Sequence, residues 1–246
     1  MRYLGGKSKI ASRIAAVILS TVRERDRYIE TCIGGGAVFE VLAPHFARPC
    51  AGDVHPDLML MWQAVARGWV PPTAVTEEQY RSLKNQPSSA LRGFVGFGCS
   101  FAAKWFATYA RDGFGGAARN FAEEASCSVV RMRPVLERAA IRHCSYEQWD
   151  VCKGDVVYCD PPYAGTTEYA GANGFDHNRF WCVLDGWVEV GAHVFVSEYS
   201  APSHWRVIGE ALHRQSVAGG TNVVATTERL FTRSRGRVFT RTGVPA

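Results

Sequence analysis

The architecture of this chain is indicated most clearly by one stretch, Val156-Val157-Tyr158-Cys159-Asp160-Pro161-Pro162-Tyr163. Its first four residues are an apolar run typical of a buried parallel strand, which places Asp160 at the strand's carboxyl end. Ligands of open α/β sheets bind at that edge. The prolines lack N–H donors, so carbonyl oxygens stay free to accept hydrogen bonds, and Tyr163 offers a flat ring. The stretch predicts a site for a planar amine, the alternative being a proline-terminated strand followed by a surface aromatic.

Strand and helix patterns alternate around this stretch. Strands are expected at 28–33, 49–52, 140–144, 193–197, 223–227 and 230–232, and helices at 8–21, 37–42, from Pro56 onward and around 180–190. A hairpin is one arrangement of the last two strands. The alternation predicts an α/β fold with a doubly wound, mostly parallel sheet.

Residues 81–126 differ in character, because glycine, aromatic and basic residues are mixed there with little periodicity. We interpret them as an inserted segment, with 1–80 and 127–246 forming the main domain, which a chain of 246 residues can accommodate. The net charge of +5 is compatible with nucleic acid but common elsewhere. Basic residues gather between Lys84 and Arg133 and again from Arg229 to Arg241, where a solvated face is the alternative.

The chain contains 8 cysteines, which are scattered through apolar stretches without a Cys-x-x-Cys pair. This pattern predicts reduced, mostly buried thiols. The start of the chain resembles neither a signal peptide nor a transmembrane helix, so a cytoplasmic protein without a membrane association is expected. The 7 histidines form no paired metal ligands, and no metal is expected.

A glycine turn follows the strand expected at 28–33. Gly34-Gly35-Gly36 would let a ligand approach the backbone closely. Asp53 ends the next strand about 20 positions later, where a carboxylate can bind the two hydroxyls of a ribose. A helix cap or a turn residue is the more ordinary role for such an aspartate. Together with Asp160, the pattern implies a nucleoside cofactor beside an amine site, while the missing Gly-x-Gly-x-x-Gly argues against a nicotinamide enzyme.

In this order, the motifs resemble those of the Dam-type DNA adenine methyltransferases (D12 class, alpha group). The resemblance lies in Arg2–Lys7, Glu30–Phe39, Gly52–Leu58 and Asp160–Tyr163, with further matches at Ser145, Tyr146, Thr166, Tyr169 and Phe175. It implies the Rossmann-like sheet of S-adenosylmethionine-dependent methyltransferases with a small recognition subdomain inserted. It also implies methyl transfer to the exocyclic N6 of an adenine flipped out of double-stranded DNA.

The resemblance assigns roles position by position. Cofactor contacts are implied for Tyr3, Lys7, Glu30, Gly34, Gly36, Asp53 and Asp160, and catalysis for Asp160, Pro161 and Tyr163. Asp160 and the Pro161 carbonyl would accept hydrogen bonds from the adenine amino group, whose lone pair is otherwise delocalised into the ring. Tyr163 would stack on the base. A core aromatic is the alternative for Tyr3, and a solvated lysine for Lys7.

The inserted segment would then recognise the target. Lys104, Arg111 and Arg119 are candidates for DNA contacts, and Trp105, Phe106 and Tyr109 are candidates for wedges or stacking platforms. The alternative is a small subdomain with its own aromatic core. The segment is shorter than in better-known members of the family, so no target sequence can be transferred.

Two departures from the family pattern stand out. Cys32 replaces a usual Phe or Pro near the glycine loop, which could alter cofactor packing, and the segment Glu198–Pro202 could line the target pocket or be an ordinary loop. Three other functions stay open. The substrate could be RNA or a protein amide, or the chain could be a DNA-binding protein that retains the fold without turnover.

Overall fold

The computed structural model describes residues 1, 3, 5–111, 119–163, 174–216 and 223–234, without the side chains of 211–216 and 223–226. The expected matches at Thr166 and Tyr169 lie outside these residues, as do Arg235, Arg237 and Arg241 of the second basic run.

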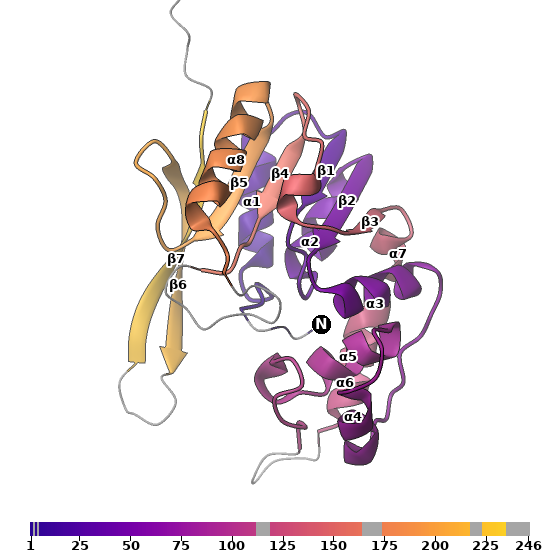
Figure 1. Cartoon of the computed structure of the whole chain (residues 1–246). Coiled ribbons are helices and arrows are strands. Elements are labelled where there is room, and N and C mark those ends of the chain that lie inside the picture. The colour runs from indigo at the N-terminus through magenta and orange to yellow at the C-terminus, as the bar shows by residue number, and fades with distance from the viewer. Residues whose placement is uncertain (2, 4, 112–118, 164–173, 217–222, 235–246) are drawn as a thin grey trace, which may run out of the picture.

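Within the described residues the core is a 7-stranded sheet in the order β3-β2-β1-β4-β5-β7-β6. Its strands are β1 (Arg27–Glu30), β2 (Arg48–Asp53), β3 (Ala140–His143), β4 (Val156–Cys159), β5 (His193–Glu198), β6 (Arg206–Ser216) and β7 (Val223–Thr232). The pairings among β1 to β5 are parallel, whereas β7 is antiparallel to both β5 and β6. The prediction of a doubly wound, mostly parallel sheet is confirmed (Figure 1).

The end of the chain corrects two predictions. The two short closing strands are one strand, β7, and its hairpin partner is β6, which the sequence analysis missed. The residues of β6 mix charged, small and apolar side chains, so the stretch lacks a clear two-residue alternation. Its extended form depends on pairing with β7 over its whole length.

Burial alternates along the central strand and assigns the helices to faces. Val156 and Tyr158 belong to the core cluster that contains α1 (Ala11–Thr21), α2 (Ala37–Leu42) and α3 (Pro56–Ala66). Val157 and Cys159 pack instead with α8 (His177–Val190). Successive side chains of a strand point to opposite faces, so α1 and α8 cover opposite sides of the sheet, as Figure 1 shows. Both faces are therefore buried.

The segment expected as an insertion is largely helical. It contains part of α4 (Glu77–Leu83), all of α5 (Ala90–Gly98) and η2 (Phe101–Ala103), and part of α6 (Phe121–Arg131). The expected limits, 81 and 126, fall inside α4 and α6. The short elements η1 (Ala43–His45), α7 (Arg133–Leu136) and η3 (Tyr146–Gln148) complete the described helices. The division into a catalytic and a recognition part stays a prediction.

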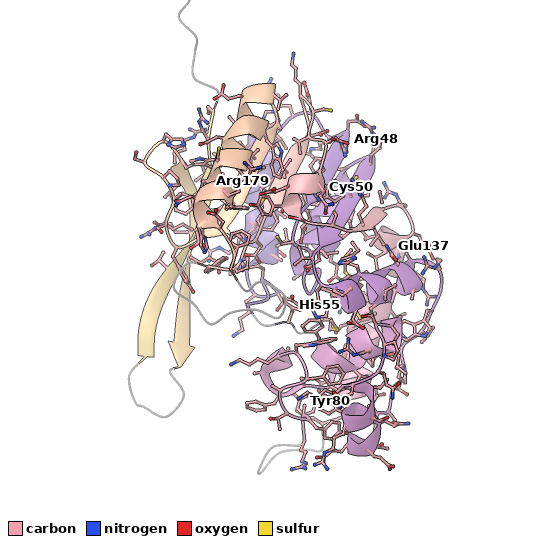
Figure 2. All side chains as sticks on the ribbon, viewed as in Figure 1. Arg48, Cys50, His55, Tyr80, Glu137 and Arg179 are labelled. Atoms are coloured by element: carbon pink, nitrogen blue, oxygen red, sulfur yellow. The ribbon has the colours of Figure 1, made fainter. Side chains whose placement is uncertain are left out.

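Aromatic side chains fill the interior of this helical part. Phe94 and Phe106 are buried, and the ring of Tyr80 lies 5.1 Å from that of Phe106. Figure 2 shows Tyr80 among these side chains, away from Arg48 at the far end of the sheet. The packing favours the aromatic-core alternative for Phe106, whose side chain is too buried to act as a wedge.

Helix α5 is docked on α3 at very short range. The buried carboxylate of Asp57 pairs with Arg92 at 2.5 Å and accepts the backbone N–H of Ser89 at 2.8 Å. One residue further, Gly93 lies directly against the backbone of Asp57, so a Cβ at this position would overlap the Asp57 carbonyl oxygen. A glycine is therefore required for the two helices to approach this closely.

Gly93→Ala is expected to lower the free energy of unfolding by about 1–3 kcal/mol, the usual cost of overpacking, because the new methyl group meets backbone. Gly186→Ala is the matched control, since Gly186 also lies within a helix and a Cβ there meets nothing within 4 Å. This control should stabilise the protein by roughly 0.5–1 kcal/mol. Urea unfolding of both variants measures the difference, and equal effects would contradict the close docking of α5.

Candidate active site

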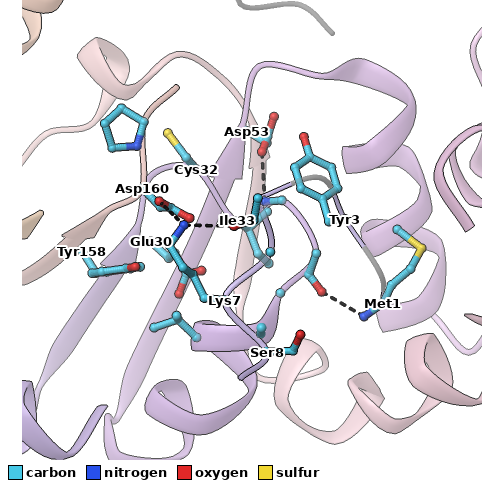
Figure 3. Close-up of a pocket in the computed structure, with 18 of the residues that line it drawn as sticks. Met1, Tyr3, Lys7, Ser8, Glu30, Cys32, Ile33, Asp53, Tyr158 and Asp160 are labelled. Atoms are coloured by element: carbon cyan, nitrogen blue, oxygen red, sulfur yellow. Dashed lines mark hydrogen bonds and ion pairs between the residues drawn. The ribbon is translucent and has the colours of Figure 1, made fainter. Parts of the chain in front are cut away.

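An open hollow of about 780 Å³, partly solvent, lies at the carboxyl ends of β1, β2 and β4. Its walls include every residue expected to bind the cofactor: Tyr3, Lys7, Glu30, Gly34, Gly36, Asp53 and Asp160. Figure 3 shows Lys7 pointing to Asp160, with Asp53 and Tyr3 on the other side of the pocket. The structure thus brings these residues together, although they are far apart in the sequence.

The glycine turn forms one wall of the pocket. Gly34 and Gly36 have φ angles of 47° and 76°, which favour glycine over other residues. Neighbours hold Gly34 on two sides, because its N–H donates to Asp53 Oδ2 at 3.0 Å and its carbonyl accepts from Trp62 Nε1 at 3.1 Å. The ring of Tyr3 packs so closely that a Cβ on Gly34 would lie 3.0 Å from it. Bulk at this turn would therefore fill the pocket.

Asp53 is buried with both carboxylate oxygens fixed by backbone. Besides the bond from Gly34, Asp53 Oδ1 accepts the N–H of His55 at 3.0 Å. Burial raises the pKa of the carboxyl against these hydrogen bonds. Asp53 does not cap α3. That role belongs to His55, whose Nδ1 accepts the N–H of Leu58 at 3.3 Å, so the helix-cap alternative for Asp53 is wrong.

Lys7 is a buried ammonium, which rules out the solvated-lysine alternative. Its Nζ lies 2.8 Å from Asp160 Oδ1 and 3.6 Å from Glu228 Oε1, and it donates to the Gly5 carbonyl at 3.0 Å. Burial opposes the charge of Lys7, but the two carboxylates outweigh burial and raise the pKa of Lys7. Burial also raises the pKa of Asp160, although Lys7 opposes it. The pKa of Lys7 and the pKa of Asp160 are thus both raised, because Lys7 interacts with two carboxylates and Asp160 with one ammonium.

Glu30 supplies another buried carboxyl group to the same wall. Its Oε2 accepts the hydroxyl of Tyr28 at 2.5 Å. Burial raises the pKa of Glu30 well above its usual value, and Asp160 raises it further. Burial therefore favours the neutral form of Glu30 more than water would.

The residues after β4 lie at the rim of the pocket. Pro161 and Pro162 line it beside Asp160. Tyr163 is buried, with Lys7 Nζ 4.8 Å from its ring centroid and the edge of Tyr199 at 4.7 Å. The segment expected to line the target pocket, Glu198–Pro202, therefore contacts this stretch through Tyr199.

Residues 3–90 match the family model of the D12 class N6 adenine-specific DNA methyltransferases. The match confirms the resemblance seen in the motifs, because the opening Gly-Gly-Lys, the glycine turn and Asp53 all lie inside it.

Several solved structures of methyltransferases are similar to the chain. The N-methyltransferase NodS from Bradyrhizobium japonicum is 11% identical, with a TM-score of 0.42 over 92% of this chain and 95% of that one. A putative methyltransferase from Escherichia coli is 13% identical, with a TM-score of 0.39 over 93% and 87%. A putative RNA methyltransferase from Pyrococcus horikoshii is 8% identical, with a TM-score of 0.43 over 91% and 83%. No curated protein sequence matches the chain.

The three residues expected to bind DNA, Lys104, Arg111 and Arg119, are all exposed. Arg111 pairs with Glu77, and Arg119 pairs with Glu124, each at 2.6 Å. Both arginines line one open hollow of about 700 Å³, which gathers them on one face of the helical part. Lys104 follows η2 on a different stretch of the same part.

The sequence analysis missed three residues of interest. His55 was overlooked as the cap of α3, Glu228 as a partner of Lys7, and Phe101 as an exposed aromatic whose residue is 69% accessible. Only Phe101 carried a local signal, since it is an aromatic residue three positions before Lys104. Cys32, the unusual residue near the glycine turn, lines the pocket, and burial raises the pKa of its thiol.

Searches for other kinds of site or segment concern the described residues alone. Among them, no three or more His, Cys, Asp or Glu residues gather in a way that could hold a metal ion. In the same ranges we find no helix with the length and apolarity needed to cross a membrane.

The pKa of His55 predicts a pH-dependent stability. Burial lowers this pKa from 6.5 to about 4. The unfolded chain therefore binds the proton first, so His55 contributes stability that is full above pH 6.5 and is lost as the pH falls toward 4. The lost contribution is about 3 kcal/mol.

His55→Asn keeps a good helix cap and removes the titration. Between pH 7 and pH 4, the wild type should lose about 3 kcal/mol more unfolding free energy than this variant. Urea unfolding at several pH values measures the difference. The variant is expected to be less stable at pH 7, since the His55 ring packs 4.2 Å from Trp105. Parallel pH curves for the two proteins would show that folding does not shift the pKa of His55, and would contradict the prediction.

Proposed function

We propose that the chain is a site-specific DNA adenine methyltransferase that transfers a methyl group from S-adenosylmethionine to N6 of a flipped adenine. One observation carries the proposal. Asp160, at the end of β4, faces the same pocket as the glycine turn and Asp53, within a chain whose residues 3–90 match this family. An amine acceptor and a nucleoside-type pocket are thus adjacent.

The pocket fits the cofactor chemically. Asp53 suits a ribose, because its carboxylate is buried beside a turn that a ligand can approach without meeting a Cβ. Among the described residues that line the pocket, Lys7 is the one basic side chain, against the carboxylates of Asp53 and Asp160. A cationic sulfonium suits this excess of acidic groups. When bound, S-adenosylmethionine supplies an activated methyl group.

Asp160 would hold the target amino group. The nitrogen lone pair of adenine must leave conjugation with the ring, and acceptors on both amino protons favour that geometry. Lys7 fixes Asp160 at 2.8 Å from its Oδ1, so the carboxylate would accept one amino proton, and the Pro161 carbonyl would take the other. As nitrogen bonds to the methyl group, these acceptors offset its developing positive charge.

Tyr163 would stack on the base, with the Lys7 ammonium 4.8 Å from its ring centroid. One face of the ring lies under the ammonium and its edge contacts Tyr199. These contacts restrict the ring to one orientation. The base position is therefore predefined relative to Asp160.

The loop from Ser100 to Tyr109 is the best candidate for contact with the DNA duplex. It is closed by a bridge between these two residues and anchored where the Ser100 hydroxyl meets the Tyr80 hydroxyl at 2.7 Å. The loop exposes Phe101 and Lys104. An exposed aromatic ring can enter the base stack, and a neighbouring lysine can contact a phosphate. We assign the wedge role to Phe101 in place of Phe106.

The first experiment incubates the protein with isotope-labelled S-adenosylmethionine and unmethylated DNA, followed by mass spectrometry of the nucleosides. Labelled N6-methyladenine is expected. Asp160→Asn keeps the shape of the side chain but loses its charge, and should lower the rate about 10²–10³-fold, the cost of removing one preorganised polar partner.

RNA and protein are incubated in parallel as alternative substrates. Label in RNA or protein but not in DNA would replace the proposed substrate. Normal cofactor binding without label in any substrate would support the non-catalytic alternative. Cofactor affinity, measured by calorimetry, shows whether Asp160→Asn still folds and binds.

DNA binding is expected to depend on Phe101 and Lys104. Lys104→Ala should weaken binding to all sequences and reduce the slope of log K against log salt by about 1, as for one lost phosphate contact. Phe101→Ala should weaken binding with little change in that slope, because no charge is lost. Fluorescence anisotropy at several salt concentrations measures both.

Lys153→Ala is the matched control for Lys104→Ala. Lys153 is also exposed, but it precedes β4 and so lies at the edge of the sheet opposite Asp160. Its substitution should leave affinity unchanged. Equal effects of the two lysine variants would place the duplex elsewhere on the surface.

A further inference from the structure

Lys7 is shared by two carboxylates that come from different strands. Its Nζ is 2.8 Å from Asp160 Oδ1, after β4, and 3.6 Å from Glu228 Oε1, on β7. The side chains of Lys7 and Glu228 are 6% and 7% exposed. Glu228 belongs to none of the motifs found in the sequence, and neither cofactor binding nor methyl transfer as described above uses it.

The surroundings of Glu228 make its charge effective. On one side it faces Lys7 and interacts electrostatically with the hydroxyl of Tyr163. On the other side lies an open hollow whose lining combines the apolar side chains of Ile10, Ile14, Val17 and Leu230 with the charged side chains of Arg13, Glu210 and Arg229, while the Glu228 side chain itself is 7% exposed. Charges in such surroundings are screened far less than in water. A buried carboxylate is costly unless it is paired, so its presence beside Lys7 needs a reason.

The reason lies in what Lys7 does to Asp160. If Lys7 paired with Asp160 alone, the positive charge of the ammonium would neutralise most of the negative charge of the carboxylate. Asp160 would then be held in place but would be a weak acceptor for the adenine amino group. A second carboxylate on the same ammonium leaves the group of three with a net negative charge.

We propose that Glu228 is a positioning residue for methyl transfer: it shares Lys7 with Asp160, so that Lys7 orients Asp160 without neutralising it. The inference rests on the function proposed above. It adds a third residue, on β7, to the pair formed by Lys7 and Asp160. It assigns Glu228 an effect on the chemical step and none on cofactor affinity, because Glu228 does not line the cofactor pocket.

The experiment is a single-turnover measurement of DNA methylation with labelled S-adenosylmethionine. Glu228→Gln keeps the shape and removes the charge, and should slow the methylation step about tenfold, corresponding to one weakened charge-assisted hydrogen bond. Glu228→Asp keeps the charge at a longer distance from Lys7 and should recover part of the rate. Cofactor affinity and melting temperature should match those of the wild type.

Glu210→Gln is the matched control. Glu210 lies on the neighbouring strand β6 and pairs with Arg229 at 3.1 Å, but its side chain is 57% exposed. Its substitution should leave the rate unchanged, because solvent screens the charge.

The outcomes separate the inference from the function on which it rests. If the wild type and Glu210→Gln methylate DNA adenine and Glu228→Gln does so at the same rate, the inference is overturned alone. If Glu228→Gln loses cofactor affinity or melting temperature in step with its rate, Glu228 is structural and the inference is also overturned. If the wild type itself does not methylate adenine, the proposed function fails and takes the inference with it.

Discussion

A buried ammonium joins three parts of the chain that are far apart in sequence. Lys7 belongs to the segment before α1, Asp160 follows β4, and Glu228 lies on β7. Strand β5 separates β4 from β7 in the sheet, so the ammonium bridges across one strand. Each of these charges would be costly to bury by itself. The position of the N-terminal segment therefore depends on the order of the strands.

The same constraint shapes the pocket. Once Lys7 is held at the sheet, Tyr3 is brought against Gly34, and the turn is pressed between that ring and Asp53. The glycine turn is thus fixed by contacts from residues both before and after it. Its shape is a property of the assembled sheet as well as of its own three glycines.

A second buried charge fixes the helical part relative to the sheet. Asp57, in the first turn of α3, pairs with Arg92 on α5. Since α3 directly follows the strand that ends in Asp53, the helices are attached within a few residues of the pocket. The exposed loop that carries Phe101 follows α5 immediately. Its place relative to the pocket is therefore set by one ion pair and one close helix contact.

The sequence predicted the strands and helices whose own residues show a clear apolar pattern. The run at Val156–Cys159 and the helix at 37–42 form as predicted, because burial on both faces and apolar periodicity leave plain marks. Helix α5 was missed, since its glycines disfavour a helix locally while its packing on α3 requires them. Strand β6 was missed because it depends on its partner.

The candidate site shows the same division. The glycine turn, Asp53 and Asp160 were found through their spacing and the resemblance, and the structure places them together. Glu228 is one glutamate in a strand of mixed character, and its distance to Lys7 is visible only in three dimensions. For Phe106 the sequence left a wedge and a subdomain core open, because nothing in its neighbourhood indicated that the ring would pack against Gly96.

The loop after α5 has a backbone that few residues would choose. Ala102, Ala103 and Phe106 have φ angles of 53°, 53° and 41°, in the left-handed region that costs residues other than glycine. Glycines would relieve this strain but would also give the loop many conformations to lose on contact with a partner. With alanines, the loop loses its conformational entropy when the protein folds and not when a partner binds. Under the function proposed above, binding of a duplex at this loop would therefore need less ordering of the protein, and more of the binding free energy would be left for distorting base pairs.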